Sequence, residues 1–420
     1  MNIRIARPLQ GGCIEAIPSK SQVHRLLIGA ALAGAPTRVD CSAPSQDIEV
    51  TADCLRSLGA AVEYDGSGFQ VEPIRQVRRG QTLQCRESGS TLRFLLPVAG
   101  ALGADCRFLM EGRLPQRPQE ALLAVLAAHG CTVSKPAPGC IELCGQLRGG
   151  NFEIPGNISS QFISGLLMAL PVLDSGSRLT VSGSMQSRPY IDMTLEMLRR
   201  FQIPVKEEEG RFSIAGEARY TTPGRVSAEG DWSNAAFWLC AGAICLQPIC
   251  CKGLNLSSFQ GDKAILSLLN RMGADVQQAD GALCISPSPL RGVEIDASDI
   301  PDLVPVLAAV AALAQGTTRI SNAQRLRLKE SDRLRAVTDA LSALGADIRE
   351  EPDGLLIEGK PRLKSGIVDS CGDHRIAMMA AVAAAGCEGP VTVLGAQAVQ
   401  KSYPAFWQHY RLLGGQAEEC

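Results

Sequence analysis

Long apolar stretches rich in alanine recur along the chain, and each follows a short polar or glycine-containing opening. Examples are LLIGAAL at 26–32, LLPVAGAL at 95–102 and VPVLAAVAAL at 304–313. Because they are apolar on every side, such stretches predict helices that are buried all round. The openings are Lys20-Ser21, Gly89-Ser90, Ser159-Ser160-Gln161, Asp231-Trp232-Ser233, Pro301-Asp302 and Asp373-His374-Arg375.

A second helix in each copy is predicted to end on a related phrase, with a glycine in five copies and Gln202 in the third. Such a glycine suits a helix C-terminus that needs a positive φ. The period of about 70 residues indicates an internal repeat, which determines the architecture before any local motif does. The phrases are LRSLGAAV (55–62), LAAHGCTV (126–133), LRRFQIPV (198–205), LNRMGADV (269–276), LSALGADI (341–348) and YRLLGGQA (410–417).

Each copy reads as a strand, a helix, a two-stranded hairpin and then the apolar helix. Units of this kind pack helices against sheets, so the fold class is α/β. Copies of this size group as three plus three. The first strand, at 2–6, follows no helix and is expected to complete the sheet of the last copy. The predicted domains are therefore 1–14 with 230–420, and an inserted domain of 15–229.

Composition excludes several classes of protein. The net charge of −2 lacks the basic excess of a nucleic-acid-binding protein. The start, MNIRIARPLQGG, has no apolar signal-peptide core, and the longest uncharged runs are too short to span a bilayer. The 16 cysteines form no CxxC pair, so we expect most of them to be small core residues in a reducing cytoplasm.

Basic residues occupy matched positions near the predicted helix starts, where anions bind. Hydroxyls at Ser21, Ser159, Ser160 and Ser187 read either as helix caps or as phosphate ligands, and Gln161 adds an amide. The carboxylates of Asp302 and Glu330 lie in basic surroundings, where an ionised acid can accept a proton. The basic residues are Lys20, Arg25, Arg113, Arg117, Lys329, Arg333, Arg335, Arg375 and Lys401.

Taken together, these motifs resemble the 5-enolpyruvylshikimate-3-phosphate synthase family. The resemblance implies a two-domain enolpyruvyl-transferase fold, in which each domain holds three βαβαββ repeats with pseudo-three-fold symmetry and substrates bind between the domains. The matching stretches are PSKSQVHR (18–25), ESGSTLRFLLP (87–97), GRLPQRP (112–118), ISSQFISGLLMALP (158–171), SRPYIDMTLEML (187–198), IPDLVP (300–305), LKESDRL (328–334), DHRIAMM (373–379) and KSYPAFW (401–407).

The resemblance implies two groups of ligand-binding residues, and domain closure to complete the site. It implies a monomer that uses no metal or cofactor. The residues implied for shikimate-3-phosphate are Lys20, Ser21, Arg25, Ser159, Ser160, Gln161, Ser187, Tyr190, Asp302 and Lys329. Those implied for phosphoenolpyruvate are Lys20, Gly89, Arg117, Gln161, Arg333, Arg375 and Lys401.

The implied reaction belongs to the shikimate pathway of aromatic amino acid biosynthesis. The 5-hydroxyl of shikimate-3-phosphate attacks C2 of phosphoenolpyruvate while C3 gains a proton, and the tetrahedral intermediate then loses phosphate. Asp302 is the expected base for the hydroxyl proton. The candidates for moving the C3 proton and assisting phosphate departure are Lys20, Glu330 and Lys401.

The sequence departs from the family pattern at 87–90 and at Phe94. Arg325 stands where one branch of the family has an asparagine for the substrate phosphate. A UDP-N-acetylglucosamine enolpyruvyl transferase is one alternative, but GRLPQRPQ (112–119) lacks the cysteine that this family carries there. RNA-terminal phosphate cyclase needs a basic RNA surface that is not evident. A non-catalytic repeat scaffold should have interchangeable helix starts, whereas these openings differ in charge.

Overall fold

The computed structural model describes residues 1–216 and 218–420. Within these residues it contains six four-stranded sheets with the same arrangement of directions, in which a parallel pair of strands continues into an antiparallel pair. Each sheet corresponds to one sequence copy, so the repeat that the sequence predicts is present in the fold.

The chain divides into two compact units, Met1–Ser19 with Glu229–Cys420 and Lys20–Ala228. Residues 15–19, which the sequence assigned to the inserted domain, lie in the first unit because strand β2 (Gly12–Glu15) pairs in parallel with β15 (Ile249–Lys252). The other strands of the first unit are β1 (Ile3–Arg7), β16 (Asp275–Ala279), β17 (Ala282–Ser286), β18 (Glu294–Asp296), β19 (Thr317–Ser321), β20 (Asp347–Glu351), β21 (Gly354–Glu358), β22 (Gly366–Asp369), β23 (Val391–Leu394) and β24 (Gln416–Glu419).

The second unit contains the sheets of the first three copies. Its strands are β3 (Thr37–Asp40), β4 (Ala61–Tyr64), β5 (Gly68–Glu72), β6 (Thr82–Arg86), β7 (Cys106–Met110), β8 (Cys131–Ser134), β9 (Cys140–Gly145), β10 (Asn151–Pro155), β11 (Ser177–Ser182), β12 (Val205–Glu208), β13 (Arg211–Ile214) and β14 (Arg225–Ser227).

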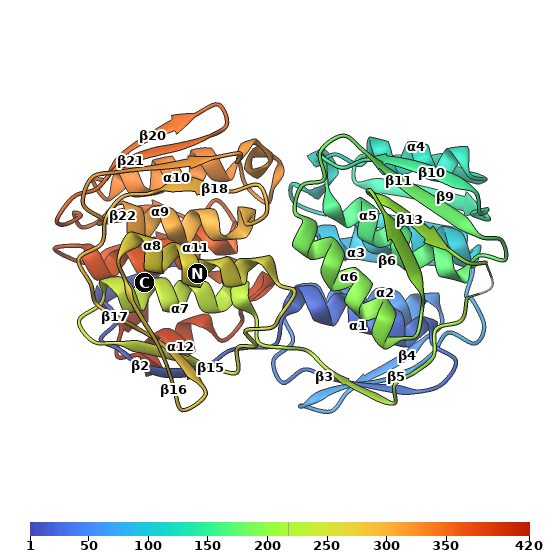
Figure 1. Ribbon diagram of the computed structural model, residues 1–420, viewed down its shortest axis with the longest axis horizontal. Helices are drawn as coiled ribbons and strands as arrows, with labels where there is room; N and C mark the ends of the chain where they lie inside the picture. The colour runs from blue at the N-terminus through green and yellow to red at the C-terminus, as the bar shows by residue number, and fades with distance from the viewer. Residues whose placement is uncertain (217) are drawn as a thin grey trace. The chain divides into compact units, whose positions relative to one another are not determined.

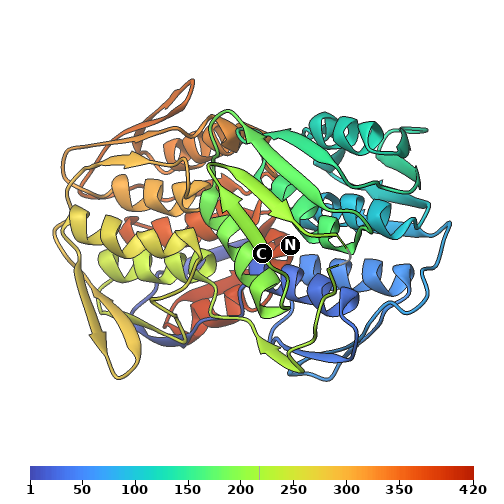
Figure 2. The same cartoon turned by 45° about the vertical axis from the view of Figure 1, so that its right-hand side comes forward.

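The apolar stretches form the buried helices at the centre of each unit, and Figures 1 and 2 show the helices of a unit running alongside one another with hairpins at the rim. Nearly every residue of these helices is buried, as their composition predicts. They are α1 (Lys20–Leu32), α3 (Gly89–Leu102) and α5 (Ser160–Ala169) in the second unit, and α7 (Trp232–Ile244), α9 (Val304–Ala311) and α11 (His374–Ala383) in the first.

The second helix of each copy buries only part of its surface and packs against the buried helices or the sheets. Its terminal glycine adopts a positive φ, for example +119° at Gly59 and +97° at Gly273. Gln202 takes the same left-handed conformation with a φ of +60°, so the third copy keeps the turn without glycine. These helices are α2 (Gln46–Leu58), α4 (Glu120–Ala128), α6 (Arg188–Arg200), α8 (Ile265–Met272), α10 (Arg333–Ala343) and α12 (Phe406–Leu412).

The N-terminal strand closes the last sheet, which the sequence predicts. Strand β1 lies between β23 and β24 and pairs antiparallel with both. Ile3 and Ile5 point into the core and are each 2% exposed. The first residues of the chain are therefore part of the core that holds the C-terminal copy together.

Two of the cysteines are not free thiols. Cys250 on β15 and Cys284 on β17 are directly opposite in the antiparallel pair and form a disulfide. The sequence does not predict this pairing, because the two cysteines are 34 residues apart and only the sheet brings their strands together. Most of the remaining cysteines are buried, as small core residues are. Among the described residues, no helix is both long and apolar enough to cross a membrane.

Candidate active site

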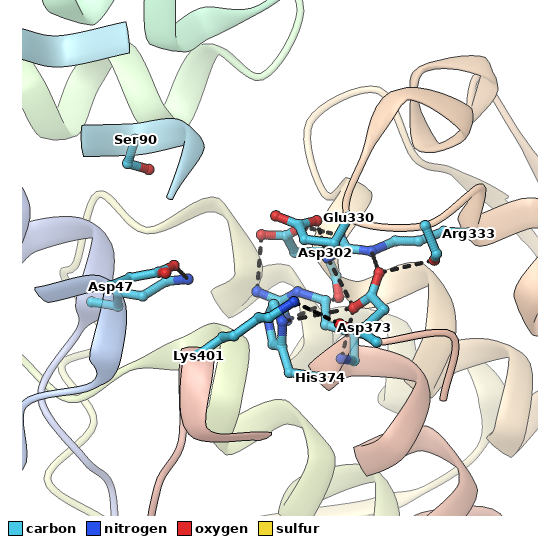
Figure 3. Close-up of polar contacts among 12 residues, drawn as sticks. Asp47, Ser90, Asp302, Glu330, Arg333, Asp373, His374 and Lys401 are labelled. Atoms are coloured by element: carbon cyan, nitrogen blue, oxygen red, sulfur yellow. Dashed lines mark hydrogen bonds and ion pairs between the residues drawn. The ribbon is translucent and has the colours of Figure 1, made fainter. Parts of the chain in front are cut away.

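In the second unit, Lys20 begins helix α1 and is held by a neighbouring helix. Its Nζ lies 2.8 Å from Oδ2 of Asp47 on α2 (Figure 3). One turn further along both helices, Nδ1 of His24 lies 2.7 Å from the hydroxyl of Thr51, which in turn contacts the hydroxyl of Thr91 on α3 at 2.7 Å. Burial, with Lys20 and Arg25 nearby, holds the pKa of His24 well below its usual value. This neutral, buried chain of contacts keeps the first turns of α1, α2 and α3 in register.

Arg25 is buried among groups from three helices. Its Nε donates to the Thr194 hydroxyl at 2.8 Å, and its Nη atoms donate to Ser164 Oγ at 3.3 Å and to the carbonyls of Ser21 at 2.6 Å and Tyr190 at 2.9 Å. Burial lowers the pKa of Arg25 to about 10, so the side chain remains cationic at neutral pH. Arg25 therefore brings together the backbone at Ser21 and Tyr190.

Gly89 leaves the space that the Arg117 guanidinium occupies. A Cβ atom at Gly89 would stand 2.9 Å from Arg117 Nη1, closer than such contacts normally allow. The preceding residue, Ser88, caps α3 by accepting a hydrogen bond from the backbone N–H of Thr91. The structure thus shows a close approach of a cation to this glycine.

The serines of the third copy divide between capping and other positions. Ser159 caps α5, and its Oγ accepts from the backbone N–H of Gln161 at 3.3 Å, which is the capping role that the sequence left open. Ser160 is buried in the first turn. Ser187 precedes α6 in the left-handed conformation, with φ of +54° and no side-chain cap. The amide of Gln161 donates to Ser90 Oγ at 2.9 Å.

In the first unit, Arg333 at the start of α10 joins three carboxylates (Figure 3). It donates to Asp373 Oδ2 at 2.8 Å, to Asp302 Oδ1 at 2.8 Å and to Glu330 Oε2 at 2.7 Å. Arg333 is 1% exposed and Asp373 is fully buried. Burial lowers the pKa of Arg333, but Asp373, Glu330 and Asp302 outweigh that effect and raise it. Arg333 therefore connects the segments that precede α9, α10 and α11 through one guanidinium.

Arg375 supplies the second cation to Asp302. Its Nη2 lies 2.9 Å from Oδ2 of Asp302, and its Nη1 donates to the Asp302 carbonyl at 3.2 Å. Burial raises the pKa of Asp302, but the charges of Arg375, Lys329 and Arg333 together hold it well below the usual value. The carboxylate is thus ionised at neutral pH, as a base must be before it accepts a proton.

Three other residues of this unit, Lys401, His374 and Arg325, contact groups that are close in sequence to Asp302 or Asp373. Lys401 is the last residue of a 3₁₀ turn, Ala396–Lys401, and its Nζ donates to the carbonyl of Gly372 at 2.8 Å. His374 is buried, with Nδ1 3.7 Å from Asp373 Oδ1. Asp302 lies in a 3₁₀ turn, Pro301–Leu303, before α9 rather than in the helix itself. Arg325 Nη2 donates to the carbonyl of Ser298 at 2.8 Å.

The structure adds four residues that the sequence did not select. Asp47 pairs with Lys20, and Asp373 both caps α11 and pairs with Arg333. Arg93 contacts Gln161, and Asp262 is buried beside Ser233. In the sequence, only position pointed to two of these residues. Asp373 precedes an apolar helix, and Asp47 lies in the first turn of α2. Their partners are distant in sequence, so no local pattern reveals the pairs.

Asp262 gives this unit a pH-dependent contribution to stability. Burial, followed by the charge of Asp302, raises the pKa of Asp262 to about 7, against about 3.9 in an unfolded chain. Between these values the folded state binds more protons than the unfolded state, so this contribution falls as the pH rises. We expect the free energy of unfolding of Asp262→Asn, relative to the unmodified protein, to rise by about 2 kcal/mol from pH 5 to pH 7.

Urea unfolding of both proteins across this pH range measures that difference. Asp275→Asn is the matched control, because Asp275 is exposed on β16 of the same unit. Its difference from the unmodified protein should stay constant with pH. A constant difference for Asp262→Asn as well would contradict the assignment of a raised pKa to this carboxyl.

Each unit thus carries its own set of candidate site residues. The second unit brings together Lys20, Arg25, Gly89, Arg117 and Gln161 through contacts among its helix starts, and the first unit brings together Asp302, Glu330, Arg333, Arg375 and Lys401. Among the described residues, no group of three or more metal-ligating side chains has the arrangement to hold a metal ion. Whether the two sets act on the same ligands stays a prediction from the sequence.

Solved structures of similar fold belong to the enolpyruvyl transferases. EPSP synthase from Acinetobacter baumannii aligns with a TM-score of 0.83 at 24% identity and covers 100% of both chains. The enolpyruvyl transferase NikO from Streptomyces tendae aligns with a TM-score of 0.81 at 21% identity and covers 99% of this chain and 98% of its own. These likenesses define the class of fold, the two-domain enolpyruvyl-transferase fold expected from the sequence.

Sequence comparison narrows the class to one family. The family model for EPSP synthase (3-phosphoshikimate 1-carboxyvinyltransferase) matches residues 3–410. The 3-phosphoshikimate 1-carboxyvinyltransferase of Clostridium acetobutylicum is 42% identical over 97% of this chain and 96% of its own length. That of Clostridium kluyveri is 40% identical over the same shares. The chain belongs to the EPSP synthase family.

Proposed function

We propose that this chain transfers the enolpyruvyl group of phosphoenolpyruvate to the 5-hydroxyl of shikimate-3-phosphate, releasing phosphate. The observation that carries the proposal is the Asp302 carboxylate, ionised and held between the guanidinium groups of Arg333 and Arg375. Such a group combines a base with two cations that suit a carboxylate or phosphate. Membership of the EPSP synthase family supports the same activity.

The reaction proceeds by addition followed by elimination. The hydroxyl oxygen of shikimate-3-phosphate bonds to C2 of phosphoenolpyruvate, its proton passes to Asp302, and the double-bond electrons take a proton at C3. The C2–O bond to phosphate then breaks, phosphate leaves with the bonding electrons, and C3 loses a proton to restore the double bond. The balanced products are the enolpyruvyl ether and inorganic phosphate.

The basic residues stabilise the charges of both substrates. In this proposal, Arg117, Arg333, Arg375 and Lys401 bind phosphoenolpyruvate with Gly89, Gln161 and Lys20, and Glu330 stands close to its reacting carbons. Lys20, Glu330 and Lys401 are the candidates for moving the C3 proton. The residues proposed for shikimate-3-phosphate are Lys20, Ser21, Arg25, Ser159, Ser160, Gln161, Ser187, Tyr190, Asp302 and Lys329.

The proposal requires residues of both units to act on one pair of substrates. It includes a monomeric enzyme of the cytoplasm that works without a metal or cofactor, as the family resemblance implies. Electrostatic stabilisation by fixed cations supplies what a metal would otherwise provide.

Phosphate release tests this function. Purified protein given both substrates in the presence of a chelator should release phosphate, and omission of either substrate should abolish the signal. An enzyme that merely hydrolyses phosphoenolpyruvate would release phosphate without shikimate-3-phosphate. That result, or the absence of release with both substrates present, would contradict the proposal.

A further inference from the structure

Arg93 is a buried arginine that contacts two segments of the second unit that carry predicted ligand residues. Its Nη1 donates to Oε1 of Gln161 at 2.8 Å, and its Nη2 donates to the carbonyl of Pro118, the neighbour of Arg117, at 3.1 Å. Its Nε donates to Oε1 of Gln119 at 3.2 Å. Arg93 also lies on α3, one turn after Gly89 and Ser90. One guanidinium therefore contacts α5 and the 117–119 segment from the helix that carries the glycine.

The contact with Arg93 determines which way the Gln161 amide faces. A guanidinium has N–H donors and no acceptor, so the amide group facing it must be the oxygen. The amide nitrogen consequently faces Ser90, whose Oγ accepts one of its two N–H groups at 2.9 Å. With the opposite orientation, two donors would face one another, and the contact with Arg93 would be lost.

We infer that Arg93 is a positioning residue, which turns the N–H groups of Gln161 toward the start of α3 to donate to a substrate oxygen there. This inference rests on the proposed function, in which Gln161 binds both substrates. Arg93 acts through Gln161 and the 117–119 segment and is not itself a catalytic residue.

The helices are packed closely enough for this contact to be specific. A Cβ atom at Gly165 of α5 would stand 2.3 Å from the carbonyl oxygen of Arg93, so the two backbones approach at that point. The guanidinium also lies over the ring of Phe162, 5.4 Å from its centroid, a cation–π arrangement. Arg93 is 4% exposed. Lysine carries the same charge but cannot supply three donors in one plane.

Arg93→Met tests the inference through kinetics. We expect the KM for phosphoenolpyruvate to rise at least tenfold and kcat to fall, because the Gln161 amide is released to rotate. In a Gln161→Ala background, the fold loss of kcat/KM caused by Arg93→Met should be at least five times smaller, because the Gln161 amide that Arg93 positions is absent. Equal losses in the two backgrounds would overturn the inference.

Arg107→Met is the control, because Arg107 is an exposed arginine of the same unit paired with Glu142, and should leave activity unchanged.

A crystal structure of the variant gives a readout that does not depend on activity. In Arg93→Met, the Gln161 side chain should leave Ser90, and an unchanged Gln161–Ser90 contact would overturn the inference. If Arg93→Met fails to fold, Arg93→Lys takes its place and should show the same changes to a smaller degree. An unmodified protein that makes no product would contradict the proposed function, while the crystal structure would still decide the role of Arg93.

Discussion

Asp302→Asn is expected to lower kcat by about 10³-fold, in the range that general-base catalysis contributes. Asparagine keeps the size of the side chain and an oxygen for Arg333, but it cannot accept the proton of the substrate hydroxyl. The affinity for shikimate-3-phosphate should change by less than about tenfold, because the proposed site holds that substrate through many other groups. Rates of phosphate release give kcat, and calorimetric titration gives the affinity.

The low pKa of Asp302 implies that the basicity of this carboxylate changes when substrate binds. Two guanidinium groups stabilise its charge in the structure, which leaves it ionised but weakly basic. When the carboxylate of phosphoenolpyruvate shares Arg333 and Arg375, their stabilisation of Asp302 falls and its basicity rises. The base would thus strengthen only once phosphoenolpyruvate, the enolpyruvyl donor, is bound. Asp296→Asn, at an exposed carboxylate on β18 of the same unit, is the control and should keep full activity. Equal losses of rate and affinity in Asp302→Asn would contradict the base role.

Arg333→Met is expected to reduce the free energy of unfolding by about 3–5 kcal/mol and to abolish turnover. Removing one member of a buried ion cluster leaves the others uncompensated, and losses of this size are typical. Asp373 would lose its guanidinium partner without gaining exposure to water, since it is fully buried beside Arg333. Arg333→Lys should retain part of the stability, because it restores the charge without the planar donors. Urea unfolding measures each variant.

The same helix provides a matched control for this prediction. Arg335, two residues further along α10, is exposed and pairs with Asp339 at 2.9 Å. An exposed pair contributes about 0–1 kcal/mol, so Arg335→Met should be nearly as stable as the unmodified protein and fully active. If Arg333→Met and Arg335→Met lose stability equally, the three-carboxylate cluster does not hold this unit together.

The repeat made much of the fold predictable, because its signals are local. Apolar stretches indicated the buried helices. The glycine phrases indicated where the second helix of a copy ends, for example at Gly59 and Gly273. The pairing of β1 with the last sheet followed from a strand that had no helix of its own. Capping also depends on neighbouring residues, which is why Ser159 could be assigned a capping alternative before the structure.

The partners of the candidate residues could not be predicted in the same way. Arg333 and Asp373 lie in different copies, and only the packing of their helices brings them together. The Gln161 amide has a direction only because Arg93 faces it across two helices. The Cys250–Cys284 disulfide likewise depends on strand pairing. Sequence position showed which side chains lie near helix starts, whereas their contacts follow from tertiary structure.

The mass of the product formed in deuterium oxide tests the proposed reaction most directly. Addition places a solvent deuteron on C3 of the enolpyruvyl group, and elimination removes one of the three hydrogens then present. Addition followed by elimination therefore predicts an ether of shikimate-3-phosphate and the enolpyruvyl group in which a large fraction carries one deuterium at C3. An ether without deuterium would contradict the addition–elimination route, and the absence of any ether would contradict the function itself.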